Sequence, residues 1–339
     1  MLGDDARDCL VRAFGERVEG RDDPRPALAE IERAVRAEGG FPLASCHGVM
    51  HTVGREYALA EDVGLDDLRD VLPRSNDPGC SAGFAHGVVT AVGPDGPEEA
   101  VEACGGAETR YRRYSCVHGV GHAFMRKVGG RLGAALDLCR GLGRDAADCG
   151  QGAFHDYWFA VAGVDGATVP GAPELDPRRL CRAQAPEFVR PCWYRAYVDN
   201  RPSVDVDSPE HLEVLCLDLE GLQRAGCITG VSVIGPADPA EQLRICAGLA
   251  ARSDQAACVR GTKAQNLLGA PIRTYVTLTE GCAALAADEE CYRWLGKAVH
   301  VLTDGRFGRD GCPRLGSEAA RRSCAEGARD SDGPLETFS

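Results

Sequence analysis

Apolar residues in this chain recur with a helical period that is broken at regular intervals. Short segments such as LGAALDLC (132–139) and PEHLEVLC (209–216) have the apolar spacing of one face of an α-helix. A break such as GLGRDAAD (141–148) follows, and then a longer apolar segment such as GQGAFHDYWFAVAG (150–163). The pattern predicts a helix A, a tight turn and a helix B in each unit, with linkers such as VGPDGPEE (92–99) between units.

The units are in register with one another along a column of cysteines. Nine copies align when Ser45 takes the cysteine position of the first copy, and most have a glycine three residues later, as in Gly83 and Gly152. The other members of the column are Cys80, Cys116, Cys149, Cys192, Cys227, Cys258, Cys291 and Cys324. Repeats of this length are typical of helical arrays, so we expect an all-α fold of about nine hairpins in a curved α/α solenoid or toroid.

A second cysteine precedes the first in seven copies, at the end of the predicted helix A. A disulfide between the two would staple the hairpin across its turn and contribute about 2–3 kcal/mol by restricting the unfolded chain. We expect the glycine of each copy to let helix A approach helix B closely. The seven expected disulfides are Cys104–Cys116, Cys139–Cys149, Cys181–Cys192, Cys216–Cys227, Cys246–Cys258, Cys282–Cys291 and Cys312–Cys324.

The chain has seventeen cysteines, and three of them remain outside these pairs. Cys9 and Cys46 can form a further bridge, which makes Cys80 a free thiol or a metal ligand. Cysteine usage of this kind is typical of proteins outside the reducing cytosol, whereas the acidic, amphipathic start of the chain does not have the pattern of a secretory signal. The alternative for these side chains is a thiol-lined store for a soft metal such as Cu(I).

The histidines are concentrated in the first four copies of the repeat. Four of them occupy one column, six residues after the cysteine position, and two more lie two residues after it. These six are His47, His51, His86, His118, His122 and His155. The same column in the last five copies holds Val198, Val233, Ala264, Lys297 and Asp330. Because all copies need similar packing, this difference favours a function for the histidines, while His211 and His300 lie outside the pattern.

The six histidines have the spacing of metal ligands. His47 with His51, and His118 with His122, are four residues apart, so each pair shares one helix face, as in helical zinc sites. An all-imidazole set suits Cu, Fe or Zn as the cofactor. Straight stacking of helices would spread the column over roughly 30 Å, so a metal site requires a tightly curved array. The competing interpretation is that each histidine is an ordinary buried residue retained by duplication.

Three side chains near the column are candidates for an acid–base or positioning role. Tyr57 follows His51 by about one and a half turns, and Asp156 and Tyr157 directly follow His155. A ligating imidazole usually donates its second N–H to a carboxylate or carbonyl oxygen, which makes Asp156 a candidate partner. The sequence contains no phosphate loop, dinucleotide fingerprint or serine-hydrolase elbow.

Charge and hydropathy argue against two classes of partner. The net charge of −13 disfavours a nucleic-acid backbone, which requires clustered lysine and arginine. No run of eighteen apolar residues is present, so we expect no membrane span. A small molecule or a peptide is compatible with this composition as a substrate.

Three stretches carry a resemblance to known sequences: CHGVMHTVGR (46–55), CSAGFAHG (80–87) and CVHGVGHA (116–123). They resemble the repeated CHxxxHxxGR, CxxGxxHG and CxHGxGHA segments of an uncharacterised bacterial and archaeal group. This resemblance covers about the first half of the chain and implies no established activity. The stapled hairpins resemble, more weakly, Sel1-like cysteine-rich α/α repeats, which implies a fold of stacked hairpins; the Sel1 consensus of small and aromatic residues is poorly kept.

We therefore predict an N-terminal half, residues 1–165, that carries the histidine column, and a C-terminal half, residues 166–339, that continues the same superhelical domain. The leading hypothesis is a metal-binding repeat protein, and beyond that a metal-dependent enzyme in which oxidative chemistry is slightly preferred to hydrolysis. One alternative is a non-catalytic scaffold that binds a peptide or protein. The other is the thiol-based copper store.

Overall fold

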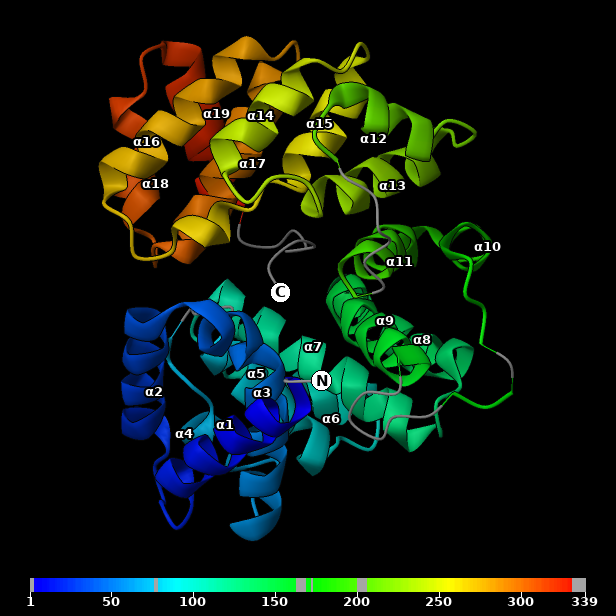
Figure 1. The fold of residues 1–339 in the computed structure, drawn as a ribbon, viewed down its shortest axis with the longest axis vertical. Coiled ribbons are helices and arrows are strands. Elements are labelled where there is room, and N and C mark those ends of the chain that lie inside the picture. Colours follow the sequence, from blue (N-terminus) through cyan, green and yellow to red (C-terminus); the bar gives the residue numbers. More distant parts are fainter. Residues whose placement is uncertain (1–2, 76–78, 163–168, 172, 200–205, 331–339) are drawn as a thin grey trace. The chain divides into compact units, whose positions relative to one another are not determined.

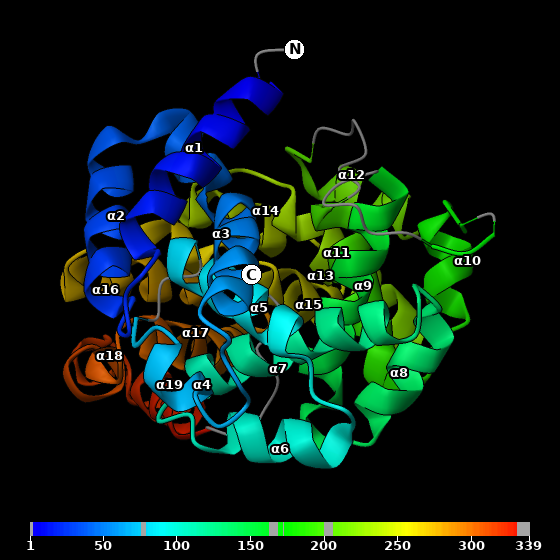
Figure 2. The ribbon, with the colours of Figure 1, turned by 90° about the horizontal axis from the view of Figure 1, so that it is seen from below.

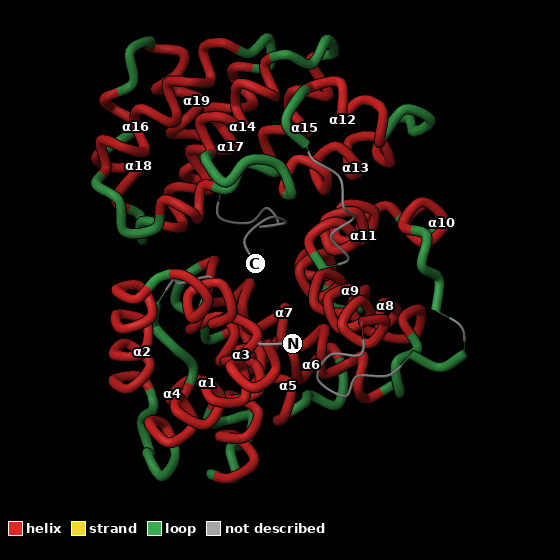
Figure 3. Tube along the Cα trace, in the orientation of Figure 1, coloured by secondary structure: helices red, strands yellow, loops and turns green. Residues whose placement is uncertain are grey.

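Helices account for all regular secondary structure in the residues that the structure describes. The computed structural model describes residues 3–75, 79–162, 169–171, 173–199 and 206–330. Figure 3 shows helices and loops but no strand in these ranges, which confirms the predicted all-α class.

The chain forms two compact units, Met1–Pro170 and Gly171–Phe338. In Figure 1 the colours run along the sequence, from blue at the start of the first unit to red at the end of the second. The helices of the first unit are α1 (Gly3–Val18), α2 (Arg25–Glu38), α3 (Gly40–Ala60), α4 (Leu68–Val71), α5 (Cys80–Val92), α6 (Pro97–Gly105), α7 (Arg110–Lys127), α8 (Leu132–Arg140), η1 (Gly143–Asp145) and α9 (Ala146–Ala162). Those of the second unit are α10 (Pro177–Arg182), α11 (Pro186–Val198), α12 (Pro209–Leu215), α13 (Gly221–Val233), α14 (Pro239–Ala247), α15 (Arg252–Arg260), η2 (Ala264–Leu267), α16 (Ile272–Glu280), η3 (Gly281–Ala284), α17 (Asp288–Leu302), α18 (Arg306–Asp310), η4 (Cys312–Arg314) and α19 (Glu318–Arg329).

A row of alternate helices forms the interior of each unit. In the first unit α3, α5, α7 and α9 pack in chain order, each against the next, and Figures 1 and 2 show this row from two sides. In the second unit α11, α13, α15, α17 and α19 do the same. Every residue from Cys80 to Val89 of α5 is buried, so this helix is enclosed on all sides. These are the predicted B helices, and the shorter helices between them are the predicted A helices.

The A helices have the sequence features of short surface helices. Several begin with a proline in the first turn, where the missing N–H interrupts no intrahelical hydrogen bond. In α8 only Ala135, Leu136 and Cys139 are buried, as expected for an amphipathic helix. The B helices begin earlier than predicted: α9 starts at Ala146, inside the break assigned to a turn, and η1 makes the connection from α8.

All seven disulfides expected within the hairpins are formed. The expectation for the remaining cysteines was wrong, because Cys46 pairs with Cys80 rather than with Cys9. Cys80 is therefore neither a thiol nor a metal ligand, and Cys9 is the one free cysteine, exposed to solvent. The Cys46–Cys80 bridge joins two successive B helices, α3 and α5, which pack directly on each other.

The glycines that follow the cysteine column pack helix B against helix B. A Cβ atom on Gly83 of α5 would lie under 3.0 Å from the carbonyl oxygen of His47 in α3. A Cβ atom on Gly152 of α9 would meet the carbonyl oxygen of His118 in α7 in the same way. These contacts correct the expectation that the glycines bring helix A close. Their lack of a side chain lets the backbones of successive B helices touch.

No helix within the described ranges is long and apolar enough to cross a membrane.

That the hairpins form one solenoid or toroid stays a prediction.

Candidate metal centre

All six histidines of the column meet in one cluster inside the first unit. They come from the four successive B helices: His47 and His51 from α3, His86 from α5, His118 and His122 from α7, and His155 from α9. Five of the six side chains are buried, and His47 is half-buried.

The four helices curve around this cluster. The rings of His47 and His155, from the first and the fourth copy, have centroids only 6.0 Å apart. Rings from adjacent helices are closer still, at 5.1 Å for His51 with His86 and 4.3 Å for His86 with His118. The glycine contacts between successive B helices allow this, because they bring the histidine-bearing backbones together. A straight row of helices would have kept the first and fourth copies far apart.

The imidazole nitrogens lie at the separations that a tetrahedral ion requires. His51 Nε2 is 3.2 Å from His47 Nε2 and 3.2 Å from His86 Nδ1, so three nitrogens from two helices converge. His118 Nε2 is 3.3 Å from His155 Nδ1. Two nitrogens bound at about 2.0–2.1 Å to a tetrahedral ion would be about 3.4 Å apart. The observed separations are close to that value.

Three groups of three histidines have ligand atoms within 4.8 Å of one another: His47, His51 and His86; His51, His122 and His155; and His86, His118 and His122. Any two of these groups share one histidine. Since a neutral imidazole gives one nitrogen to a metal ion, filling one group leaves neither of the other two complete.

Polar side chains around the cluster fix the orientation of two rings. The Nδ1–H of His122 donates to Asp156 Oδ1 at 3.2 Å, which leaves Nε2 as the ligand atom of that ring. His86 Nε2 is hydrogen-bonded to Ser115 Oγ at 3.2 Å. The other ring nitrogen, Nδ1, faces His51. Contacts of this kind set the tautomer and raise the basicity of a ligating imidazole. Asp156, which the sequence offered as a partner because it follows His155, contacts His122 of the neighbouring helix.

The two candidate tyrosines lie apart from the histidine rings. The hydroxyl of Tyr57 donates to the carbonyl oxygen of Arg21 at 2.9 Å, and its ring packs on Phe84. Burial raises the pKa of Tyr57 above its ordinary value. Tyr157 packs edge-to-face on Trp158, with centroids 5.4 Å apart. Neither tyrosine lines a pocket that reaches the cluster.

A small pocket, with a cavity volume of about 10 Å³, opens onto the cluster. It is formed by all four B helices, and its wall includes His51, His122 and Asp156. Its outer part carries Arg55 and Arg126, each four residues after a histidine of the cluster. The pocket connects the histidines with the surface of the first unit.

The residues around the cluster that sequence reasoning missed are Ser115, Arg55, Arg126 and Phe159. The ring of Phe159 packs on His155 with centroids 4.1 Å apart. Arg55, Arg126 and Phe159 all lie ten residues after the cysteine position, so the register of the repeat contained a signal for them. Ser115 precedes its cysteine directly and has no comparable signal.

The histidine column also has a counterpart in the second unit. Lys297 and Asp330 occupy the same column in the last two copies, and Lys297 Nζ lies 3.2 Å from Asp330 Oδ2. The last two copies thus bring this column into contact, as the first four copies do. His211 and His300 lie outside it: His211 is exposed beside Asp207, and burial lowers the pKa of His300.

The chain matches no known protein-family model, and no curated protein or solved structure shows significant similarity to it.

Proposed function

We propose that this protein is a metalloprotein that binds one transition-metal ion per chain through three imidazoles of the histidine cluster. The observation that carries the proposal is the convergence of three imidazole nitrogens: His51 Nε2 lies 3.2 Å from both His47 Nε2 and His86 Nδ1. The contact of His51 with His86 joins side chains from different copies of the repeat. Each of the three groups offers three ligands and leaves a fourth position for water or substrate, as in catalytic zinc sites.

The donor set narrows the ion to a few candidates. Each three-histidine group consists of neutral nitrogen ligands, which suit Cu, Fe and Zn better than Mg or Ca. The one carboxylate at the cluster, Asp156, is hydrogen-bonded to a histidine and holds that ring in place. This arrangement favours a site built for a transition metal.

The pocket beside the cluster favours an enzyme over a passive metal carrier. It reaches His51 and His122 directly, so a molecule in the pocket can approach a bound ion. Its cavity volume of about 10 Å³ holds about one water molecule, so the body of a small substrate would lie at the mouth of the pocket. Arg55 and Arg126 would orient a negatively charged group of the substrate, and Asp156 would keep His122 in the ligating tautomer. Copper or iron would supply oxidative chemistry here and zinc would supply hydrolysis; our preference remains oxidation.

The alternatives fit the structure less well. A thiol-based copper store requires free thiols, and sixteen of the seventeen cysteines are in disulfides. A non-catalytic scaffold has no need for six converging histidines, most of them buried. The likeness to the bacterial and archaeal Cys/His repeat group remains a proposal, and it suggests that the cluster is a shared feature of that group.

Titration of the full chain, without a histidine tag, with cobalt(II) tests the proposal. Tetrahedral cobalt with nitrogen ligands absorbs visible light far more strongly than hydrated cobalt, so we expect an intense band that saturates near one equivalent. The double variant His51→Gln/His86→Gln removes a ligand from each of the three groups and should lose the band, whereas His211→Gln, which changes an exposed histidine of the second unit, should keep it. A wild-type chain that gives only the spectrum of hydrated cobalt would contradict the proposal.

A further inference from the structure

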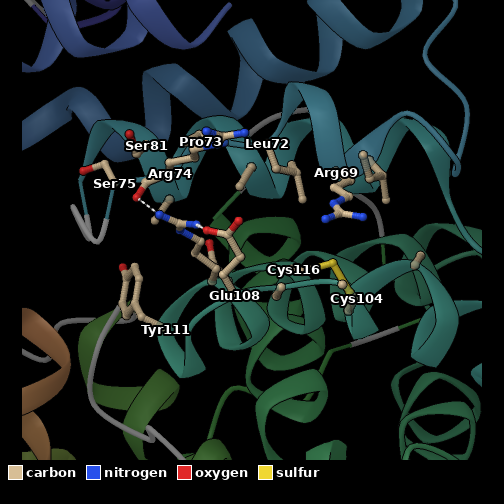
Figure 4. Close-up of a pocket in the computed structure, with 18 residues that line it drawn as sticks. Arg69, Leu72, Pro73, Arg74, Ser75, Ser81, Cys104, Glu108, Tyr111 and Cys116 are labelled. Atoms are coloured by element: carbon tan, nitrogen blue, oxygen red, sulfur yellow. Dashed lines mark hydrogen bonds and ion pairs between the residues drawn. A yellow bond between two sulfur atoms is a disulfide. The ribbon is translucent and has the colours of Figure 1, made fainter. Parts of the chain in front are cut away.

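A second, larger pocket lies in the first unit between α4, α5, α6 and α7 (Figure 4). Its cavity volume is about 110 Å³, its mouth is open to solvent, and it shares no lining residue with the pocket at the histidine cluster. A cavity of this size holds about one aromatic ring, so the rest of a small organic ligand would lie at the open mouth.

The mouth of the pocket is positively charged. Arg69 and Arg74 are exposed there, and Arg112 is mostly buried, with its side chain 18% exposed. Among the described residues of the lining, Glu108 is the only carboxylate, and it pairs with Arg112 at 2.6 Å. Hydrogen bonding and charge from Arg112 lower the pKa of Glu108, and the charges of Arg74 and Arg69 add to this effect. The pocket is thus a cationic site on a chain whose net charge is −13.

Arg112 has donor capacity left over inside the pocket. One of its terminal nitrogens pairs with Glu108, and the other donates to the carbonyl oxygen of Arg74. Its Nε atom is buried and has no hydrogen-bond acceptor among the described residues. A buried donor without an acceptor costs free energy, so the pairing of Arg112 with Glu108 and the Arg74 carbonyl leaves part of this guanidinium unsatisfied.

The floor of the pocket is apolar and ends in two serines. Leu68, Ala82 and Tyr111 are buried there and offer no charge. Ser81 and Ser115 are buried in the same wall; Ser81 donates to Glu32 behind it, and Ser115 is hydrogen-bonded to His86. A ligand that fits this lining has a negative group at the arginines and an apolar body against the floor.

We propose that this pocket binds a small organic anion with an apolar body, such as an aliphatic or aromatic carboxylate, sulfonate or phosphate ester. Binding requires no metal ion in the histidine cluster, so this site stands independently of the proposed function. Its occupant would lie one side chain away from the cluster, because Ser115 contacts both.

Two neighbouring glycines offer a matched pair for the test. A Cβ atom on Gly105 or on Gly106 would meet no other atom within 4 Å, and both residues are exposed. Only Gly106 lines the pocket. Gly106→Trp therefore places a large ring at the mouth, whereas Gly105→Trp places the same ring outside it.

The probes are 8-anilinonaphthalene-1-sulfonate and its uncharged analogue N-phenyl-1-naphthylamine, titrated by fluorescence into the metal-free full chain. We expect saturable binding of the sulfonate that is weakened about tenfold or more by Gly106→Trp and left unchanged by Gly105→Trp. The double variant Arg69→Gln/Arg74→Gln should weaken the sulfonate by about tenfold and leave the uncharged analogue unaffected. Equal affinity of the wild type for both probes would overturn the anion site. Absence of saturable sulfonate binding, or binding that survives Gly106→Trp, would overturn the pocket itself.

Discussion

His51 Nε2 and His86 Nδ1 lie 3.2 Å apart, although 35 residues of chain separate them. The two side chains occupy the same position in successive copies of the repeat, on α3 and α5. Their contact shows that one column of the repeat becomes the inner wall of the first unit. A feature that looks like repetition in the sequence is thus a convergent set of nitrogens in space.

The first prediction concerns histidines that belong to two ligand groups. His51, His86 and His122 are each shared between two groups, whereas His47, His118 and His155 each belong to one. We expect His86→Gln to weaken metal affinity more than His47→Gln, because it leaves one complete group, His51, His122 and His155, whereas His47→Gln leaves two. Equilibrium dialysis against zinc measures both. Equal losses in the two variants would rule out the overlapping arrangement.

The second prediction concerns the carboxylate behind His122. Asp156→Asn keeps the shape of the side chain but removes the charge that holds His122 Nδ1–H at 3.2 Å. We expect metal affinity to fall about 10- to 100-fold, with the fold retained. Asp137→Asn on the exposed face of α8 is the control and should change nothing. Unchanged metal affinity in Asp156→Asn would show that Asp156 has no role in metal binding.

The third prediction concerns the glycine contacts that bring the B helices together. Gly152→Ala would force a Cβ atom against the carbonyl oxygen of His118, so we expect a loss of about 1–3 kcal/mol and a melting temperature lower by about 1–4 °C. Gly133→Ala in α8 is the control. Its added Cβ atom would meet no other atom within 4 Å, and alanine favours a helix over glycine, so this variant should be as stable as the wild type or more stable. Thermal unfolding followed by circular dichroism compares them. Equal melting temperatures in the two variants would mean that the B helices are not in backbone contact at Gly152.

The fourth prediction concerns the cysteines. With sixteen of them in disulfides, a thiol assay on the denatured, unreduced chain should count one thiol per molecule, that of Cys9. The variant Cys9→Ser should then give none. A count near seventeen would instead restore the thiol-based copper store.

Much of this arrangement could be predicted from the sequence because its causes are local. The hairpins follow from apolar spacing and from prolines at helix starts, and the seven hairpin disulfides follow from cysteine pairs close in sequence. The histidine column could be found by aligning the copies of the repeat on their cysteines. What could not be predicted depends on how successive copies pack. The pairing of Cys46 with Cys80, the contact of Gly83 with α3 and the bond from Ser115 to His86 all join separate hairpins.

The most direct test of the central claim is the metal content of the full chain purified without a histidine tag and incubated with copper, iron or zinc before removal of unbound ions. The account predicts about one equivalent of one of these metals in the wild type, and none in the triple variant His51→Gln/His86→Gln/His122→Gln, which damages all three ligand groups. A folded wild-type chain that retains no metal, or a triple variant that retains the same amount, would contradict it.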